Sequence, residues 1–256
     1  MRLDSPNLWF RKGDKMIRRL LLPMAAAAAL AGPAIAADIP YGQGASAYSP
    51  VPIFTWTGLY LGGHIGYAWD NNNLTGWGPY YAFSGVNYAP SGVIGGAHVG
   101  YNFQFNQIVF GLEGDVDGTG VNQSYSWGAV TYGTQIPIEG SIRGRLGFAL
   151  DRALFYATGG VAFAGVTNTY QTWFGYNSIG RSLAGWTIGG GLEYALFNNW
   201  SVRAEYRYAD FGSVTDYPFA AVPGGAVTHH VTENVVRAGF SYKFDGLFGP
   251  SAALAR

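Results

Sequence analysis

The sequence predicts an all-β protein, an eight-stranded antiparallel up-and-down β-barrel that crosses a membrane with its strands. Three observations favour this class. Only 12% of the 256 residues are charged, whereas glycine (39 residues) and aromatic residues (16%) are abundant. A soluble domain usually carries about 25% charged residues. Apolar residues alternate with small or polar ones along eight segments, and the connections between these segments are alternately short and long.

The first four strands are expected at residues 58–69, 92–105, 108–117 and 139–149. In each, large apolar residues share one face, and glycine, histidine or charged residues share the other. The outward residues of the first strand, for example, are Leu59, Leu61, Ile65, Tyr67 and Trp69. The other four strands are expected at residues 153–166, 183–196, 200–210 and 234–244, where the pattern repeats.

The connections predict how the barrel is oriented. Those near Asn106-Gln107, Asp151-Arg152 and Asn198-Asn199 are a few residues long and are expected to be periplasmic turns. Residues 70–91, 117–138, 167–182 and 211–232 are expected to be four long extracellular loops. Strand aromatics gather near both ends, as they do at membrane interfaces. Trp56 lies on the wrong parity for this belt.

Other classes fit less well. Disordered chains are poor in aromatics, and the absence of cysteine excludes disulfide scaffolds and thiolate metal sites. No window approaches the roughly 20 continuous apolar residues of a spanning helix. A soluble lipocalin-like barrel is the main alternative. Its apolar face would be inside, whereas here the charged residues share the glycine face and the aromatics take the opposite one.

The N-terminus has the pattern of a secretion signal. A basic start at Met16 precedes an apolar run over residues 20–30, and a small-x-small pattern ends at Ala36. We expect residues 1–36 to be an upstream extension plus signal peptide, 37–53 a periplasmic linker, 54–244 the barrel and 245–256 a C-terminal tail. The mature chain then carries a net charge of −4 without a basic patch, so no nucleic-acid partner is expected.

Four motifs resemble a known family. They are FTWTGLYLGGHIGYAWD (residues 54–70), GLEGD (111–115), YATGG (156–160) and VVRAGFSYKF (235–244). Together they are similar to small outer-membrane surface-antigen barrels of alphaproteobacteria, a porin-labelled family related in architecture to the OmpA-type membrane domain. The resemblance implies location in the outer membrane and contact with its lipid and lipopolysaccharide. It also implies insertion by the barrel-assembly machinery, which is thought to recognise a closing aromatic strand, here Phe240, Tyr242 and Phe244.

Charged residues on the inward face form the candidate site. They are Glu113, Asp115, Glu139, Glu193 and Glu205 with Arg143, Arg145, Arg203, Arg207, Arg237 and Lys243. We expect Glu193 opposite Arg203, Glu113 near Arg145 and Asp115 near Arg143. Because side chains just fill an eight-stranded barrel, these pairs are expected to plug the lumen. The alternative is that they line a narrow ion path.

Other candidate sites are weak. His64 and His98 point inward, with His98 expected across from Glu113, and a hydrogen-bonding role is favoured over metal binding. The adjacent His229 and His230 would point apart on a strand. We expect no catalytic residue, metal or cofactor.

Three function classes follow. The favoured one is a structural and surface-interaction barrel whose loops contact an unknown extracellular partner. The alternatives are a small passive channel for ions or small solutes and, least favoured, an enzyme acting on lipid A. A lipase would need Ser, His and an acid converging on one surface, and the sequence has no nucleophile-elbow motif.

Overall fold

The computed structural model describes residues 54–78, 81–127, 130–197 and 199–245. Regular structure in these residues consists of ten strands: β1 (Gly58–Asp70), β2 (Asn72–Gly78), β3 (Tyr81–Tyr88), β4 (Ser91–Phe105), β5 (Ile108–Trp127), β6 (Val130–Leu150), β7 (Ala153–Gln171), β8 (Tyr176–Phe197), β9 (Trp200–Asp216) and β10 (Ala226–Phe244). No helix in this part of the chain is long and apolar enough to cross a membrane. The expected signal peptide, linker and tail beyond Asp245 lie outside the described residues.

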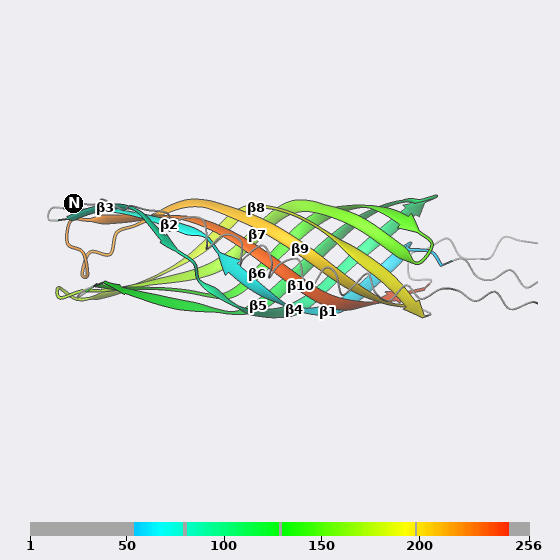
Figure 1. Cartoon of the computed structure of the whole chain (residues 1–256), viewed down its shortest axis with the longest axis horizontal. Helices are drawn as coiled ribbons and strands as arrows, with labels where there is room; N and C mark the ends of the chain where they lie inside the picture. The colour runs from blue at the N-terminus through cyan, green and yellow to red at the C-terminus, as the bar shows by residue number, and fades with distance from the viewer. Residues whose placement is uncertain (1–53, 79–80, 128–129, 198, 246–256) are drawn as a thin grey trace, which may run out of the picture. The chain divides into compact units, whose positions relative to one another are not determined.

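Eight of these strands close into a ring. The order is β1, β4, β5, β6, β7, β8, β9, β10, every neighbour is antiparallel, and β1 pairs with β10 from Leu59↔Phe244 to Asp70↔Glu233. Figure 1 shows the tilted strands of this ring. Closure leaves neither β1 nor β10 with a free edge between these residues, as lipid requires. The predicted eight-stranded antiparallel barrel is confirmed.

Strand alternation gives the half of the ring next to the short turns an apolar outer face. Leu112 is 68% exposed and Ile65 64% exposed, whereas charged neighbours such as Glu113 and Arg143 are buried inside. We call this end of the barrel the turn end, and the opposite end, where the long connections lie, the hairpin end. The arrangement is the inverse of a soluble barrel and suits contact with lipid.

The sidedness reverses toward the hairpin end. There the outward residues are polar and exposed, as at Gln135, Gln171, Ser178, Ser182 and Ser213. The inward residues of this half and of the transition are apolar and buried: Ala68, Ile94, Val121, Ile136, Ala162, Ala164, Val166, Leu183, Ala209, Phe211, Val231 and Val235. The change on the outside occurs near Trp186 and Tyr208, whose rings lie 5.4 Å apart. Interfacial aromatics of this kind mark the edge of a bilayer.

Much of what the sequence predicted as loop is strand. β5 to β10 have 17 to 22 residues, whereas about 9 to 11 suffice to cross a membrane. The expected loops 117–138, 167–182 and 211–232 therefore consist largely of strand that projects beyond the apolar band. The prediction was wrong there because the projecting halves reverse their sidedness. Bulges near Gly118, Gln135 and Val231 also interrupt the period.

The expected loop 70–91 contains a further hairpin, β2–β3. β2 pairs with β10 from Ala226↔Trp77 to His230↔Asn73, above the point where β1 stops pairing. Its sequence carries Asn, Thr and Gly rather than an alternating apolar set, which is why the strand pattern was not recognised. This hairpin extends the wall of the projecting part.

The closing strand ends as expected at the turn end. Phe240 and the neighbouring aromatics Tyr242 and Phe244 follow one another on the outer face, and Trp200 of β9 packs against Tyr242 with 5.1 Å between ring centroids. These rings cover the β9–β10 seam at the rim of the apolar band.

Candidate functional site

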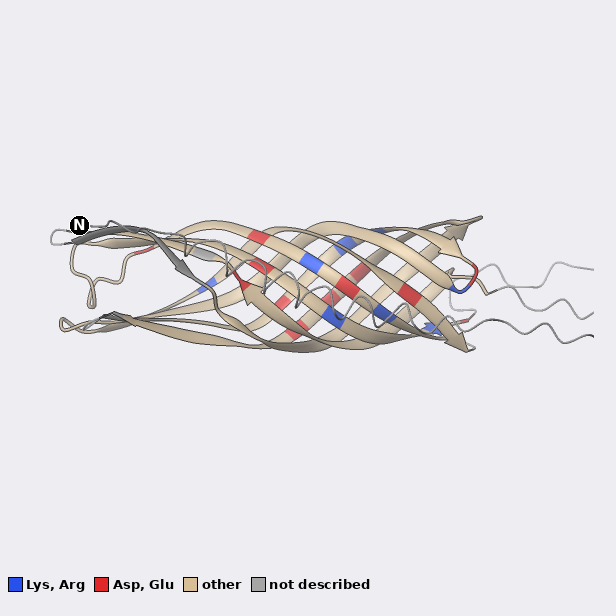
Figure 2. Cartoon of the chain, in the orientation of Figure 1, with Lys and Arg blue, Asp and Glu red and all other residues tan. Residues whose placement is uncertain are grey.

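The barrel lumen is the candidate site, because the inward positions of the apolar band collect most charged side chains of the described residues. Figure 2 shows them concentrated over the central part of the strands. Twelve buried residues form what we call the charged layer: Glu113, Asp115, Asp117, Glu139, Glu193, Glu205, Glu233, Arg143, Arg145, Arg203, Arg207 and Arg237. Seven carboxylates thus meet five guanidinium groups.

Glu113 of β5 lies at the centre of this layer. Its Oε1 accepts a hydrogen bond from Arg143 Nη2 at 2.6 Å, and its Oε2 accepts one from Arg203 Nη1 at 2.6 Å. The hydroxyl of Tyr60 also donates to Oε2, at 2.8 Å. One carboxylate therefore ties three separate strands together across the lumen.

Arg143 and Arg237 extend the network to β9. Arg143 donates to Asp115 at 2.9 Å and to Glu205 at 2.7 Å. Arg237 donates to the same Glu205 oxygen at 2.7 Å and lies 3.5 Å from Asp117. Because each guanidinium has five donors in a fixed fork, one arginine can serve several carboxylates at once.

Arg145 holds the turn-end side of the layer. It forms an ion pair with Glu193, and its guanidinium lies 3.8 Å from the ring centroid of Tyr156, a cation–π contact. The hydroxyl of Ser201 donates to the other oxygen of Glu193 at 2.5 Å. Glu193 is thereby satisfied on both oxygens.

Arg207 holds the hairpin-end side. It contacts Glu139, Glu233 at 3.1 Å and Asp115 at 3.2 Å. Close by, His64 is hydrogen bonded to Asp117, and its other ring nitrogen lies 3.1 Å from His98. Both histidines are therefore members of the lumen network.

The strand register corrects part of the expected pairing. Arg143, not Arg145, stands opposite Glu113, and Ser141 stands opposite Asp115. The offset depends on a bulge between Gly118 and Val121 in the β5–β6 hairpin, which the sequence does not reveal. Diagonal contacts still bring Arg145 to 3.9 Å from Glu113, and Arg143 bonds Asp115 as described.

One expectation about neighbours is confirmed and one needs correction. Glu193 faces Arg203 in the register as predicted, although its ion pair is with Arg145 while Arg203 reaches across the lumen to Glu113. His98 stands opposite Asp115 rather than Glu113, so that prediction was wrong. Long side chains in a narrow barrel select partners across the lumen as readily as on the adjacent strand.

The composition of the layer also differs from the prediction. Lys243 does not belong to it, because its Nζ donates to the carbonyl of Thr55 at 2.6 Å and lies 3.5 Å from Asp245 at the rim. Asp117 and Glu233 were missed. Both have the inward parity of their strands, which is the signal that would have identified them. Asp70, buried opposite Glu233, also has the inward parity of its strand and was also missed.

An apolar cluster, which we call the turn-end cap, closes the lumen below the charged layer. It contains Trp56, Val109, Ala149, Leu154, Tyr156 and Ala195, with Phe54 packed against them. Trp56 is 3% exposed, and its backbone NH donates to the side chain of Gln104 at 2.7 Å. The unexplained parity of Trp56 is thus resolved: its ring turns inward and fills the mouth of the barrel.

Above the charged layer, the apolar residues of the hairpin half fill the lumen, and a second polar group follows them. We call this the outer cluster: Tyr132, Thr134, Asn168, Tyr170, Arg181, Asp216 and His229. The ring of His229 is stacked on Tyr132, and the Tyr170 hydroxyl bridges His229 and Asp216 at 2.7 and 2.8 Å. Its neighbour His230 is exposed on the other side of the wall.

Two pKa values in the outer cluster are shifted. Burial lowers the pKa of His229 to about 4, although the nearby Asp216 carboxylate opposes the shift. Burial alone would raise the pKa of Asp216, but hydrogen bonds from Asn168, Tyr170 and Arg181 hold it below its ordinary value. His229 is therefore neutral and Asp216 ionised at neutral pH.

Polar side chains of the lumen are bonded to one another. No three His, Asp or Glu side chains among the described residues are grouped so as to hold a metal ion. The lumen histidines bond to one another and to Asp117 and Ser241. Cap, charged layer, apolar layer and outer cluster follow one another along the lumen, and most of their side chains are buried.

An inside-out barrel with an apolar outer face and buried ion pairs in its lumen defines an outer-membrane β-barrel protein. The chain belongs to the outer membrane protein beta-barrel domain family, which it matches over residues 20–244. It is 33% identical to the 31 kDa outer-membrane immunogenic protein of Brucella melitensis, covering 85% of this chain and 96% of the relative. It is 32% identical to the 22 kDa outer membrane protein of Rhizobium leguminosarum bv. viciae, covering 75% and 80%. The structure of OprG from Pseudomonas aeruginosa aligns with a TM-score of 0.49 at 14% identity, covering 73% of this chain and 96% of OprG.

Proposed function

We propose that this protein is a closed outer-membrane barrel with a structural and surface-interaction role, and that it neither conducts nor catalyses. The single observation that carries the proposal is the filled lumen. An open path would have to pass the turn-end cap, the ion-paired charged layer and the apolar layer in turn. An eight-stranded barrel is just wide enough for side chains to fill, which supports the same reading.

Single-channel recording in planar bilayers tests the closed lumen. We expect the folded wild-type protein to insert without producing steady conductance steps. If it is instead a small passive channel, discrete steps appear, and Arg143→Gln changes their cation/anion selectivity because Arg143 lies in the lumen. Reproducible steps that respond to this substitution would replace the plug with the channel.

The absence of catalysis is the second part of the proposal. Its support is that His64 and His98 are buried in the lumen and bonded to Asp117 and Ser241, away from the lipid-facing surface where a lipid A substrate would lie. The named relatives are described as immunogenic or outer membrane proteins. Release of fatty acid from lipid A by the purified barrel, abolished by His64→Gln, would contradict it.

The surface for partner contact is proposed to be the hairpin end. Exposed aromatic side chains gather on the β7–β8 and β9–β10 connections and at the start of β8: Trp173, Phe174, Tyr176, Tyr217 and Phe219. The two connections are joined, since the Thr172 hydroxyl donates to the Ala221 carbonyl at 2.5 Å. Exposed aromatic groups of this kind are typical of interaction sites.

The native absence of cysteine allows a direct test of which end faces outward. A Trp173→Cys variant should react with a membrane-impermeant maleimide on intact cells. An Asp151→Cys variant, in a turn-end connection, is the matched control and should react only after the outer membrane is permeabilised. The opposite labelling pattern would remove the hairpin end as a contact surface for extracellular partners.

A further inference from the structure

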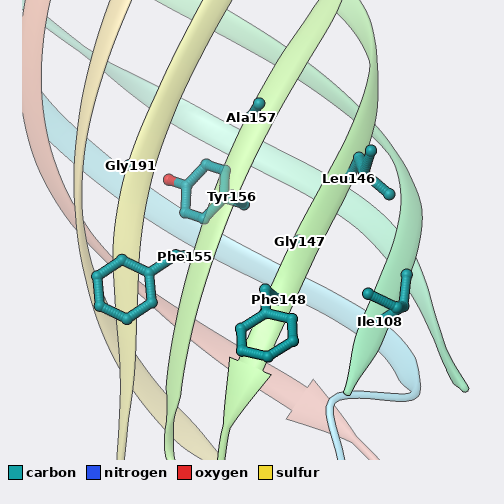
Figure 3. Close-up of a pocket in the computed structure, with 8 residues that line it drawn as sticks. All are labelled: Ile108, Leu146, Gly147, Phe148, Phe155, Tyr156, Ala157 and Gly191. Carbon is teal, nitrogen blue, oxygen red and sulfur yellow. The ribbon is translucent and has the colours of Figure 1, made fainter. Parts of the chain in front are cut away.

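The outer face of the barrel has a groove close to the turn end (Figure 3). Its volume is about 510 Å³, within the range of roughly 300–1,000 Å³ usual for ligand sites. Leu146, Phe148 and Phe155 form its walls, and its floor is the backbone at Gly147 and the methyl of Ala157. It lies on the apolar face of the barrel, so its occupant comes from the membrane.

The strand register shows that this groove continues toward the middle of the apolar band. Ala157 pairs with Leu146 on one side and with Gly190 on the other, and two residues further along Gly159 pairs with Gly144. A side-chain carbon added at Gly144 or Gly159 would meet only a backbone oxygen, at 3.7 and 3.8 Å. These adjacent outward positions therefore leave an open channel in the wall of large side chains.

The length of the channel suits one lipid chain. It runs from Phe155 to Val161, where large outward side chains resume. Six residues of strand span about 20 Å. At a tilt of about 40° this is roughly 15 Å along the membrane normal, a little over half of an apolar band about 25 Å tall. The channel thus matches one leaflet, the one on the turn-end side.

Charged groups at the rim suit a headgroup. The turn joining β6 to β7, directly below Phe148 and Phe155, consists of Asp151 and Arg152, both exposed. Arg152 Nη1 donates to the Leu196 carbonyl at 2.9 Å, which holds the guanidinium beneath the β7–β8 pair. The remaining guanidinium donors can bind a phosphate, and the Asp151 carboxylate can accept hydrogen bonds from a primary ammonium.

We infer that the groove holds one acyl chain of a periplasmic-leaflet phospholipid, whose phosphate binds Arg152 and whose ammonium binds Asp151. Phosphatidylethanolamine has both groups. Phosphatidylglycerol lacks the ammonium, and the quaternary amine of phosphatidylcholine cannot donate a hydrogen bond. The inference rests on the outer-membrane location and on the proposed orientation, with the turn end in the periplasm, and not on whether the lumen conducts.

Native mass spectrometry of the folded full chain tests this site. The protein is released from nanodiscs that contain equal amounts of phosphatidylethanolamine, phosphatidylglycerol and phosphatidylcholine. We expect one phosphatidylethanolamine to be retained. Gly159→Leu, which fills the channel without a backbone clash, and Arg152→Gln, which removes the charge, should each lower the lipid-bound fraction about tenfold.

Two controls make the outcome decisive. Gly95→Leu adds the same side chain at an outward glycine of β4 that also has open space, and Arg181→Gln removes an exposed arginine at the hairpin end. Neither should change lipid retention. In dodecyl sulfate gels a folded barrel migrates differently before and after boiling, and the same difference in every variant shows that all variants are folded. The proposal is overturned if the three lipids are retained equally, if Gly95→Leu acts like Gly159→Leu, or if Gly159→Leu dissociates a dimer instead of a lipid.

Discussion

The two halves of this barrel share one ladder of strands but have opposite sidedness. In the half near the turn end, apolar side chains face outward and five arginines are buried inside. In the half near the hairpin end, polar side chains face outward, and apolar residues with the outer cluster lie inside. Strand pairing continues across the change, interrupted only by bulges. The comparison teaches that the surrounding solvent, lipid or water, selects the outward face, while the backbone ladder is indifferent to it.

The halves also fill the lumen with different chemistry. The charged layer consists of ion pairs whose members are fully buried, such as Glu113 with Arg143 and Arg203. The outer cluster is built from hydroxyls, an amide and His229, and its one ion pair joins buried Asp216 to Arg181, whose side chain is 39% exposed. Removing one partner of a fully buried ion pair lowers the free energy of unfolding much more than removing one partner of a pair that water reaches, such as Arg181 with Asp216.

The largest expected difference concerns closure of the ring. A chain that ends at Ser241 loses Tyr242 and Phe244, the pairing of Leu59 with Phe244, and the aromatic rim. Open edges in lipid cost several kcal/mol per unsatisfied backbone group, so this chain should not insert. Replacing the β2–β3 hairpin by a short glycine-serine link should leave insertion intact, because that hairpin pairs with β10 only above the apolar band.

Outer-membrane fractionation measures both changes, and a chain ending at Phe244 serves as the control that should insert normally. If the hairpin replacement blocked insertion as completely as the cut after Ser241, the projecting half would be part of the assembly unit. The two halves would then not be separable.

The next largest effect is expected in the charged layer. Glu113→Gln leaves Arg143 and Arg203 without their shared carboxylate, and loss of a buried partner costs about 3–5 kcal/mol. In a double-mutant cycle, Glu113→Gln and Arg203→Gln should show strong coupling. Asp216→Asn and Arg181→Gln in the outer cluster should couple by no more than about 1 kcal/mol.

Urea unfolding of barrels folded in lipid vesicles gives the four free energies of each cycle. Additive effects for Glu113 and Arg203 would show that the buried pair contributes no interaction of its own. The distinction between the two halves would then rest on the outer face alone.

A smaller effect tests the outer face directly. Ile142→Arg places a charge on the lipid face of β6, where the side chain is 61% exposed. A charge near the bilayer midplane costs about 2–4 kcal/mol. Ser178→Arg makes the same addition on the exposed outer face of β8 in the projecting half and should change unfolding by about 0.5 kcal/mol or less. Equal costs would mean that the apolar band extends to Ser178.

The sequence was sufficient for the half that lipid surrounds and insufficient for the other. The predicted limits at the turn end agree with the structure: strands start at Ile108, Ala153 and Trp200, and the last strand ends at Phe244. They were predictable because alternation against lipid is strong and the turns are short. Hairpin-end limits of β1 and β4 agree to within one residue, but those of β5 to β10 were missed because one parity rule, apolar outside, was applied to the whole strand. On β8 that rule predicts loop beyond Leu183, close to Trp186 where the sidedness reverses, whereas the strand continues to Tyr176.

The inward residues were predictable from parity, but their partners were not. Parity alone places Glu113, Arg145 and Glu205 in the lumen, and it would also have placed Asp117 and Glu233 there. Partner choice depends on the bulge that sets the β5–β6 register and on the reach of long side chains across the lumen, neither of which a single sequence encodes locally. Trp56 has the inward parity of β1 and was left without a role because the aromatic belt was expected only on the outer face.

The smallest expected effect concerns pH and separates the halves by their titratable groups. In the folded outer cluster His229 has a pKa of about 4, whereas in an opened hairpin end it should return to its ordinary value near 6.5. The opened state therefore binds more protons between about pH 6.5 and pH 4. Stability of the hairpin end falls as the pH drops through this window, by up to about 3 kcal/mol, and is regained at neutral pH.

Hydrogen exchange of the β10 amides measures this opening, once the rates are corrected for the pH dependence of intrinsic amide exchange. Amides at Val227 to Val231 should lose protection between pH 6.5 and pH 4, while those at Val236 to Phe240 keep it, because there the strand closes the ring against β1 inside the apolar band. His229→Gln should remove the pH dependence, and His230→Gln, an exposed neighbour, should not. Loss of protection along the whole of β10 at once would show that the two halves open as one unit, so that their different interiors have no separate stability.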